Sequence, residues 1–247
     1  MPQGHQAKAV VVLEKLGKTF GHSNVVLDEV DLTIRQGEFV ALLGASGCGK
    51  STLLNLIAGL EAPTAGAMEI PANGAAFMFQ DATLYPWLTA RGNIELALSL
   101  SGVPKAQHAA RVTELLELVH LGHAEDRRPH ELSGGMRQRV ALARALAQDR
   151  QVLLMDEPFA ALDAITRDLL HEELERIWRR TGRTIIFVTH NVREAVRLGQ
   201  RVLLLSSRPG RVIREWAVTA EQKQPDQAAL LSTEMTAALR EEISRHV

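Results

Sequence analysis

The most informative stretch of this sequence is Gly44-Ala45-Ser46-Gly47-Cys48-Gly49-Lys50-Ser51. It matches the pattern G-x-x-x-x-G-K-[ST], in which the glycines let backbone N–H groups turn inward around phosphate oxygens. Residues 38–43 before it are typical of a strand, and residues 51–60 after it are typical of a helix with one apolar face. Such a helix directs the positive end of its dipole at a bound anion. We therefore predict a phosphate-binding loop, called the P-loop below, with Lys50 at the β- and γ-phosphates and the Ser51 hydroxyl on Mg²⁺.

Two carboxylates follow a second apolar strand. Val152–Met155 is entirely apolar and ends directly before Asp156 and Glu157. Ligands of open α/β sheets bind beside the carboxyl ends of the strands, so both carboxylates should lie near the P-loop. Asp156 suits a water ligand of Mg²⁺, and Glu157 suits a general base that polarises an attacking water. The alternative, a solvated acidic turn before Pro158, is disfavoured by the presence of the P-loop.

Strand and helix alternate in most of the chain. Thr184–Val188 and Val202–Ser206 are apolar runs typical of strands, and a helix with a charged side is expected over residues 164–180. Continuous apolar strands that alternate with helices predict a mainly parallel sheet covered on both faces. The first third of the chain instead reads as strands separated by turns, and residues 226–246 read as an amphipathic helix.

Helical periodicity prevails in the middle of the chain. The expected helices are Ala90–Leu100, Lys105–His120 and Gly134–Ala147. We therefore expect an α/β core formed by residues 1–84 and 149–247, interrupted by a helical subdomain of residues 85–148.

The composition narrows the class of function. The chain has 247 residues, and its 28 Lys and Arg balance 29 Asp and Glu, which argues against a basic surface for nucleic acid. No run reaches the roughly 18 apolar residues that a membrane span needs, so we expect a protein on the cytoplasmic side. The single cysteine, Cys48, excludes an intrachain disulfide and fits a reducing compartment. Cys48 lies at a helix N-terminus, where a thiol pKa can be lowered, but the favoured interpretation is a small tolerated residue.

A third motif, Leu132-Ser133-Gly134-Gly135-Met136, precedes a strong helical run. Ser133 can cap that helix, and the two glycines allow an anion to approach the backbone; a plain cap with a flexible turn is the alternative. The P-loop, this motif and the Asp156-Glu157 strand, in this order, closely resemble the ATP-binding-cassette ATPases. The resemblance covers residues 13–218 and departs from the usual signature at Met136, where glutamine is common.

The resemblance implies a fold, cofactors and a second copy of the chain. The implied fold is α/β: a P-loop NTPase core with a mainly parallel sheet, an antiparallel β part at the N-terminus and the inserted helical subdomain. The implied cofactors are ATP and Mg²⁺. In this family two cassettes form a head-to-tail homodimer, in which the signature motif of one copy faces the P-loop of the other across ATP.

Further positions match the family residue by residue. Phe20 resembles the aromatic that stacks on adenine, although an ordinary packed phenylalanine is the alternative. Gln80 resembles the glutamine that senses Mg²⁺ and the attacking water, and His190 resembles the switch histidine at the γ-phosphate. Asp163 resembles the aspartate at the dimer interface and also suits a helix N-cap.

These matches and the motifs give three sets of site residues. The expected catalytic residues are Lys50, Gln80, Glu157 and His190. The expected nucleotide-binding residues are Phe20, Gly44, Ala45, Ser46, Gly47, Cys48, Gly49, Lys50, Ser51, Thr52, Gln80, Ser133, Gly134, Gly135 and Asp163. The expected metal ligands are Ser51, Gln80 and Asp156.

A finer resemblance concerns the kind of cassette. Leu84-Tyr85-Pro86-Trp87, together with residues 158–167 and 206–211, is similar to the nitrate, sulfonate and taurine importers. This implies a peripheral ATPase on the cytoplasmic side of the inner membrane, docked on separate transmembrane permeases that an extracytoplasmic solute-binding protein supplies, with no nucleic-acid partner. Tyr85-Pro86-Trp87 would line the permease groove, with local packing as the alternative. A non-transport regulatory ATPase and an exporter cassette with separate membrane subunits remain alternatives.

Overall fold

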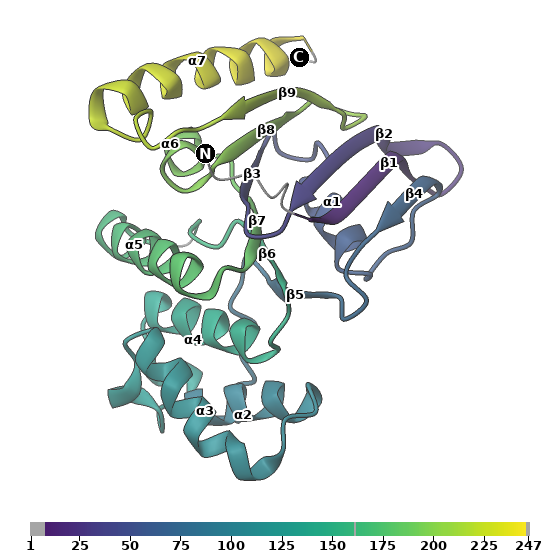
Figure 1. The fold of residues 1–247 in the computed structure, drawn as a ribbon. Coiled ribbons are helices and arrows are strands. Elements are labelled where there is room, and N and C mark those ends of the chain that lie inside the picture. Colours follow the sequence, from purple (N-terminus) through teal and green to yellow (C-terminus); the bar gives the residue numbers. More distant parts are fainter. Residues whose placement is uncertain (1–7, 161, 246–247) are drawn as a thin grey trace, which may run out of the picture.

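A six-stranded sheet forms the centre of the molecule. The computed structural model describes residues 8–160 and 162–245. The strand order is β5-β6-β7-β3-β8-β9, and all neighbours are parallel except β9, which runs antiparallel to β8. Its strands are β3 (Phe39–Leu43), β5 (Ala75–Met78), β6 (Val152–Asp156), β7 (Thr184–Val188), β8 (Arg201–Leu205) and β9 (Val212–Ala217). The predicted mainly parallel sheet is confirmed (Figure 1).

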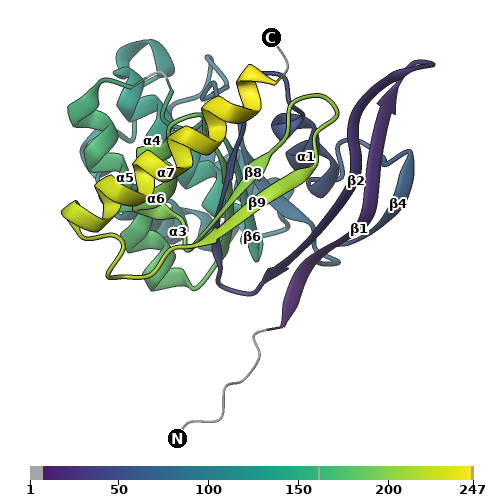
Figure 2. The same ribbon diagram turned by 90° about the horizontal axis from the view of Figure 1, so that it is seen from above.

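A smaller antiparallel sheet stands beside the central one. It has the order β2-β1-β4 and consists of β1 (Ala9–Phe20), β2 (Asn24–Arg35) and β4 (Ala65–Glu69). Figure 2 shows the long ribbon of β1 and β2 curving away from the central sheet on the side of α1 (Lys50–Ile57). The expected antiparallel part at the N-terminus is thus present.

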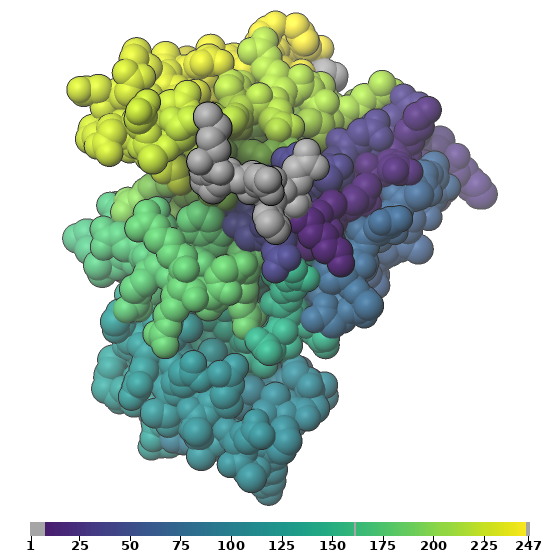
Figure 3. All heavy atoms as spheres, in the orientation of Figure 1, coloured from purple at the N-terminus to yellow at the C-terminus, as the bar shows by residue number. Residues whose placement is uncertain are grey.

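Helices cover the central sheet on both faces. α1 and the antiparallel sheet lie against one face, and the remaining helices lie against the other. Those are α2 (Ala90–Leu100), α3 (Lys105–Leu118), α4 (Gly134–Ala147), α5 (Ala164–Thr181), α6 (Val192–Leu198) and α7 (Pro225–Ser244), with short 3₁₀ turns at Gly122–Ala124 and Pro129–Glu131. In Figure 3 the teal helices α2 and α3 form the end of the molecule farthest from the yellow α7.

The strands are apolar throughout because both faces of the sheet are buried. Side chains of a strand alternate between the two faces. In β3, Phe39, Ala41 and Leu43 join the helical cluster, whereas Val40 and Leu42 join the cluster that contains α1. The helical cluster also includes residues of α2, α3 and α4, so these helices share one buried core with the sheet. The exact division at residues 85 and 148 stays a prediction.

Some expected boundaries and strands differ from the structure. The helix expected over Lys105–His120 ends at Leu118, because His120 takes the left-handed conformation with φ 53°. The helix expected to reach residue 60 ends at Ile57, before Gly59 with φ 73°. β4 and β9 were not expected, since both are largely exposed and lack a continuous apolar pattern. His246, at the end of the expected tail helix, lies outside the described residues.

The helices also test the expectation about membranes. Within residues 8–160 and 162–245, no helix combines the length and the apolar character that a membrane span requires.

Candidate functional site

The P-loop connects the buried strand β3 to α1, and the last residue before the helix is a glycine with a positive φ. Gly49 caps α1 with φ 105°, a conformation that residues with a Cβ rarely adopt. A Cβ at this position would lie 2.7 Å from Cδ2 of Leu27, so the neighbouring β2 also excludes a side chain. The N-terminal N–H groups of α1 therefore remain directed at the space above the loop.

Lys50 is held by the loop itself. Its Nζ donates hydrogen bonds to the carbonyl oxygens of Gly44 and Ala45, both at 2.9 Å, and lies 3.8 Å from Sγ of Cys48. The side chain is buried, which fixes the ammonium group at the floor of the loop. The predicted position of Lys50 next to the phosphate-binding backbone agrees with this geometry.

Cys48 does not behave as expected from its position. Its side chain is buried, and burial raises the pKa of the thiol, with the nearby Lys50 ammonium offsetting only part of this effect. The alternative of a lowered thiol pKa is wrong, because removal of the sulfur from water outweighs the positive charge, and the favoured interpretation of a small tolerated residue agrees with this burial. Cys48 is therefore a packed small side chain of the P-loop and not a reactive thiolate.

Asp156 ends β6 beside the P-loop. A hydrogen bond links its carboxylate to the side chain of Ser51. Burial raises its pKa first of all, and the neighbouring Glu157 raises it further, whereas Ser51 and Lys50 lower it. A hydroxyl and a carboxylate in contact form a donor set that fits Mg²⁺, which keeps several waters and binds substrate phosphates. Within the described part of the chain, no group of three or more His, Cys, Asp or Glu offers a separate metal cage.

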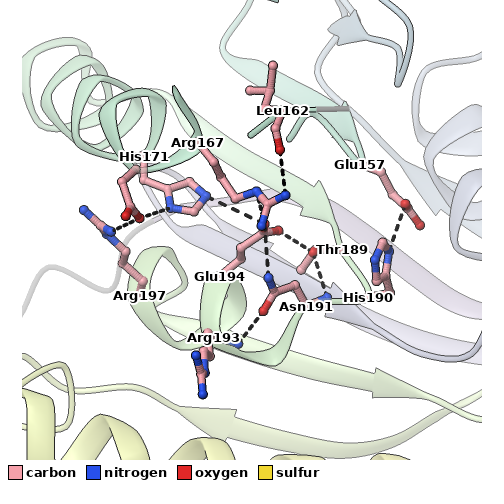
Figure 4. A network of polar contacts seen from close by, with 11 residues as sticks. Glu157, Leu162, Arg167, His171, Thr189, His190, Asn191, Arg193, Glu194 and Arg197 are labelled. Atoms are coloured by element: carbon pink, nitrogen blue, oxygen red, sulfur yellow. Dashed lines mark hydrogen bonds and ion pairs between the residues drawn. The ribbon is translucent and has the colours of Figure 1, made fainter. Parts of the chain in front are cut away.

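Glu157 and His190 meet at the ends of adjacent strands. Nδ1 of His190 lies 3.0 Å from Oε2 of Glu157 (Figure 4). Glu157 has a φ of 42°, and its backbone N–H donates to the carbonyl oxygen of Val188 at 3.1 Å. A non-glycine residue in this conformation costs free energy and is found preferentially at functional sites. Glu157, the predicted general base, and His190, the predicted switch histidine, thus lie in contact within a single copy of the chain.

The signature motif forms the N-terminus of α4. The Ser133 hydroxyl accepts a hydrogen bond from the backbone N–H of Met136 at 3.2 Å, so the expected cap is present. Gly134 is exposed, whereas Gly135 is buried against α5. A Cβ on Gly135 would lie 2.3 Å from Cγ2 of Thr166. The second glycine is thus required by the packing of two helices.

Asp163 caps α5 next to this contact. Its carboxylate accepts a hydrogen bond from the backbone N–H of Thr166 at 3.0 Å. Hydrogen bonds from Thr166 hold the pKa of this exposed carboxyl below its ordinary value. The expected N-cap role is confirmed, and Asp163 lies one helical turn from the residue that contacts Gly135.

Gln80 is held through its backbone. Its side chain is exposed, and its carbonyl oxygen accepts a hydrogen bond from Nε2 of Gln138 on α4 at 2.7 Å. Arg144 on the same helix donates to the carbonyl oxygens of Ala82 at 3.0 Å and Thr83 at 2.7 Å. The sequence analysis missed Gln138 and Arg144; their only signal is a polar residue within a helix that is otherwise largely apolar.

Phe20 lies at the end of β1 and pairs with Asn24 of β2, two residues before Val26, which lies against Gly49 of the P-loop. Its ring is partly exposed, and Nζ of Lys18 lies 4.8 Å from the ring centroid. Lys18 also donates to Glu61 and to the carbonyl oxygen of Ala62, both at 2.8 Å. The ring thus has an exposed surface and a cation beside it, which is compatible with the predicted stacking on a base.

Known proteins resemble this chain in sequence and in fold. The sequence profile described as ABC transporter matches residues 27–160, more than half of the chain. The chain belongs to the ABC transporter family. The resemblance inferred from the three motifs is therefore confirmed, and the cassettes of this family are ATPases.

Two relatives are named as ATP-binding proteins of transport or import. The chain is 49% identical over 213 residues to the bicarbonate transport ATP-binding protein CmpC of Synechococcus elongatus, which covers 81% of this chain and 32% of that protein. The chain thus spans about a third of the length of CmpC. The chain is also 46% identical over 213 residues to the aliphatic sulfonates import ATP-binding protein SsuB of Bacillus subtilis, and the match covers 83% of this chain and 82% of that protein.

A solved cassette supports the fold. The dimeric post-hydrolysis state of the ATP-binding cassette MJ0796, bound to ADP and Pi, superimposes with a TM-score of 0.75 at 33% identity. The superposition covers 85% of this chain and all of that chain. The α/β cassette fold of this ABC transporter family member is therefore confirmed.

The contact between Gly135 and Thr166 yields the first prediction. Gly135→Ala should lower the free energy of unfolding by about 1–3 kcal/mol, because the new methyl group overlaps Cγ2 of Thr166. Adding Thr166→Ser removes that methyl group and should restore much of the loss. Gly134→Ala is the matched control, since the nearest atom, on Arg137, is 4.0 Å away. Urea unfolding followed by circular dichroism measures the free energy of unfolding of the wild-type protein and the three variants. Equal losses of this free energy in Gly135→Ala and Gly134→Ala would contradict the packing role of Gly135.

A second prediction concerns the buried His171 of α5. Its ring packs edge-on against Phe159, and its nitrogens lie 3.9 Å from Asp168 and Glu194. Burial, assisted by Arg197 and Arg167, lowers its pKa to about 4 against the opposing effect of Asp168. At neutral pH the ring is uncharged, so neither 3.9 Å contact is then an ion pair.

The sign of the pH effect follows from this depressed pKa. The unfolded chain takes up the proton near pH 6.5, whereas the folded chain takes it up only near pH 4, so stability is lost as pH falls through this window. The loss due to His171 is about 2 kcal/mol between pH 7 and pH 5. His171→Gln should remove this component of the acid sensitivity in urea unfolding at the two pH values. An unchanged pH dependence in the variant would show that His171 is not buried in the neutral form.

Proposed function

We propose that this chain is the ATP-hydrolysing subunit of an ABC importer for a small oxyanion such as a sulfonate, taurine or nitrate. The observation that carries the proposal is the convergence of Lys50, Asp156 and the Glu157–His190 pair at the carboxyl ends of the adjacent strands β3, β6 and β7. These groups supply phosphate binding, a metal site and a base within one edge of the sheet.

Each group has a distinct task in hydrolysis. The N–H groups and Lys50 of the P-loop bind the phosphates, and Ser51 with Asp156 hold Mg²⁺. The bound Mg²⁺ neutralises charge that develops on the phosphate oxygens. The Glu157 carboxylate accepts the proton of the attacking water, and His190, 3.0 Å away, fixes the orientation of that carboxylate. Gln80 completes the proposed set from the end of β5.

A second copy of the chain completes the proposed site. Ser133 and Gly134 are exposed at the N-terminus of α4, where backbone N–H groups can face the phosphates of ATP on the partner. Asp163 lies exposed at the start of the neighbouring α5. The dimeric MJ0796 cassette supports this arrangement by analogy.

An apolar groove supports docking to a permease. A cavity of about 550 Å³ between the P-loop side of the sheet and α2 is lined by large side chains that are exposed, namely Leu60, Phe79, Tyr85 and Leu100. Trp87 packs against Tyr85 with ring centroids 5.4 Å apart and is itself exposed. Arg144 lines the same cavity and holds the loop after Gln80. A permease helix in this groove would therefore act on Gln80 and α4 together, on the cytoplasmic side of the membrane.

The name of SsuB, an import protein, favours an importer over the exporter and regulatory alternatives, and CmpC is named for bicarbonate transport. Both names concern small oxyanions, bicarbonate and sulfonates. A solute-binding protein that delivers such an anion to the permease belongs to the proposal.

A third prediction tests the chemistry. Glu157→Gln should keep ATP affinity, lower kcat for ATP hydrolysis by about 10²–10⁴-fold and accumulate an ATP-bound dimer, because the amide cannot accept the proton. Steady-state phosphate release, ATP binding and gel filtration measure the three effects. Glu221→Gln, on an exposed turn, is the control and should match the wild-type protein. Turnover at the wild-type rate in Glu157→Gln would remove this residue from the role of base.

A fourth prediction tests the importer assignment in cells. A strain that lacks the gene should fail to grow on one source supplied alone, either taurine or an alkanesulfonate for sulfur or nitrate for nitrogen. The wild-type gene should restore growth and Glu157→Gln should not. Leu100→Glu, which puts a charge on a 79% exposed side chain of the groove, should also fail. Leu230→Glu, at a 66% exposed position on α7, is the matched control and should restore growth.

Two results would contradict this assignment. Normal growth of the deletion strain on every source would exclude these solutes as the sole cargo. Rescue by Leu100→Glu as good as rescue by Leu230→Glu would exclude the groove as the permease contact.

A further inference from the structure

A buried polar network lies directly behind His190. We propose that Glu194 of α6 is a positioning residue that joins the loop carrying His190 to the loop carrying Asp163 and thereby sets kcat. This inference rests on the proposed ATPase site and adds a residue that touches neither nucleotide nor metal. Figure 4 shows Glu194 between the two loops, with contacts on both sides.

On one side, Glu194 holds the residues that flank His190. Its Oε2 accepts a hydrogen bond from the Thr189 hydroxyl at 2.6 Å, and its Oε1 accepts one from Nδ2 of Asn191 at 3.4 Å. The Thr189 hydroxyl in turn accepts a hydrogen bond from the backbone N–H of Asn191 at 3.0 Å. The chain is thus fixed immediately before and after His190 by one carboxylate.

His190 depends on this backbone support. Its side chain is 62% exposed, and the Glu157 carboxylate is its hydrogen-bond partner among the described residues. The position of its ring is therefore set by the loop of residues 189–191. A shift of that loop would change the 3.0 Å contact between His190 and Glu157.

On the other side, Glu194 contacts α5 through Arg167. Nε of Arg167 lies 3.5 Å from Oε1 of Glu194, and NH2 of the same guanidinium donates to the carbonyl oxygen of Leu162 at 2.8 Å. Leu162 directly precedes Asp163. The backbone N–H of Arg167 also donates to the carbonyl oxygen of Asp163 at 2.9 Å. Arg167 therefore ties Glu194 to the segment that caps α5.

Burial raises the pKa of the Glu194 carboxyl, and the Thr189 hydroxyl and the Arg167 guanidinium offset part of this effect. The Glu194 side chain is 8% exposed, and a buried carboxylate is costly unless a cation and hydrogen bonds compensate it. His171, 3.9 Å from Oε1, is neutral at pH 7 and supplies no charge. Within the described part of the chain, Arg167 is the permanent cation in ion-pair contact with Glu194. The carboxylate and the guanidinium therefore have to move together.

A small cavity separates this network from the proposed base. It measures about 50 Å³ and is bordered by Glu157 and His190 on one side and by Arg167, Thr189 and Glu194 on the other. The Glu157–His190 pair and the three side chains of the network thus border the same space. A displacement of residues 162–163 at a dimer interface would reach His190 through two side chains, Arg167 and Glu194.

The test compares steady-state kinetics of the full-length chain and its variants. Glu194→Gln keeps the shape but loses the charge, so kcat for ATP hydrolysis should fall about 10- to 100-fold while ATP affinity stays within about twofold. Arg167→Gln should act in the same direction. The double variant should be no slower than the slower single variant, because both changes cut the same link.

Matched variants separate positioning from folding. Glu172→Gln removes a carboxylate of α5 that is 69% exposed and contacts Arg197, and it should leave kcat and KM unchanged. Thr189→Val removes the hydroxyl that donates to Glu194 at nearly constant shape, and it should lower kcat even if Glu194→Gln fails to fold. Thr189→Ser keeps the hydroxyl and should retain the wild-type kcat.

Three results would overturn the inference: a kcat within twofold of wild type for folded Glu194→Gln or for Thr189→Val, a parallel loss of kcat and ATP affinity, or losses that multiply in the double variant. These results are distinct from failure of the proposed function. In that case the wild-type protein itself would not hydrolyse ATP faster than Glu157→Gln.

Discussion

Everything at the site depends on the common direction of β6, β7 and β3. Because neighbouring parallel strands end at the same edge, the P-loop lies beside Asp156, Glu157 and His190, which follow it by more than a hundred residues in the sequence. The strands can carry these polar ends only because their interiors are anchored by apolar packing on both faces. The sheet thus brings these groups to one edge, where polar contacts hold the individual loops.

α4 extends this arrangement away from the sheet. Its N-terminal Gly135 packs on Thr166, its Gln138 holds the backbone of Gln80, and its Arg144 holds the loop beside the apolar groove. Thr166 adjoins Arg167 on α5, which contacts the network behind His190. One helix therefore touches three of the regions that the family motifs mark. A rigid element with such contacts transmits displacement without any change of its own conformation.

The sequence predicts those parts of the molecule that depend on a pattern of neighbouring residues. The P-loop, the strand before Asp156 and the cap at Ser133 each follow from a few consecutive residues. β4 and β9 were not predicted, because exposed edge strands need no apolar pattern. The thiol pKa of Cys48 is raised because its side chain is buried in the apolar cluster that contains α1, and the sequence of the loop alone does not reveal this burial. The roles of three further residues, Gln138, Arg144 and Glu194, were not predicted, because packing brings their partners from distant parts of the chain. These partners are Gln80, 58 positions away, Thr83, 61 positions away, and Arg167 on another helix.

The two hydrogen bonds that Lys50 makes to Gly44 and Ala45 have a consequence for selectivity. Two of the three N–H groups of the ammonium are engaged by carbonyl oxygens at 2.9 Å, so the P-loop does not present a bare positive charge to the solvent. A lone sulfate or inorganic phosphate has to compete with these carbonyls for one lysine. A triphosphate reaches the helix N-terminus, the ammonium and the Ser51–Asp156 pair at once, and it gains from all three. The loop is thus expected to favour a chain of linked phosphates over a single phosphate or sulfate.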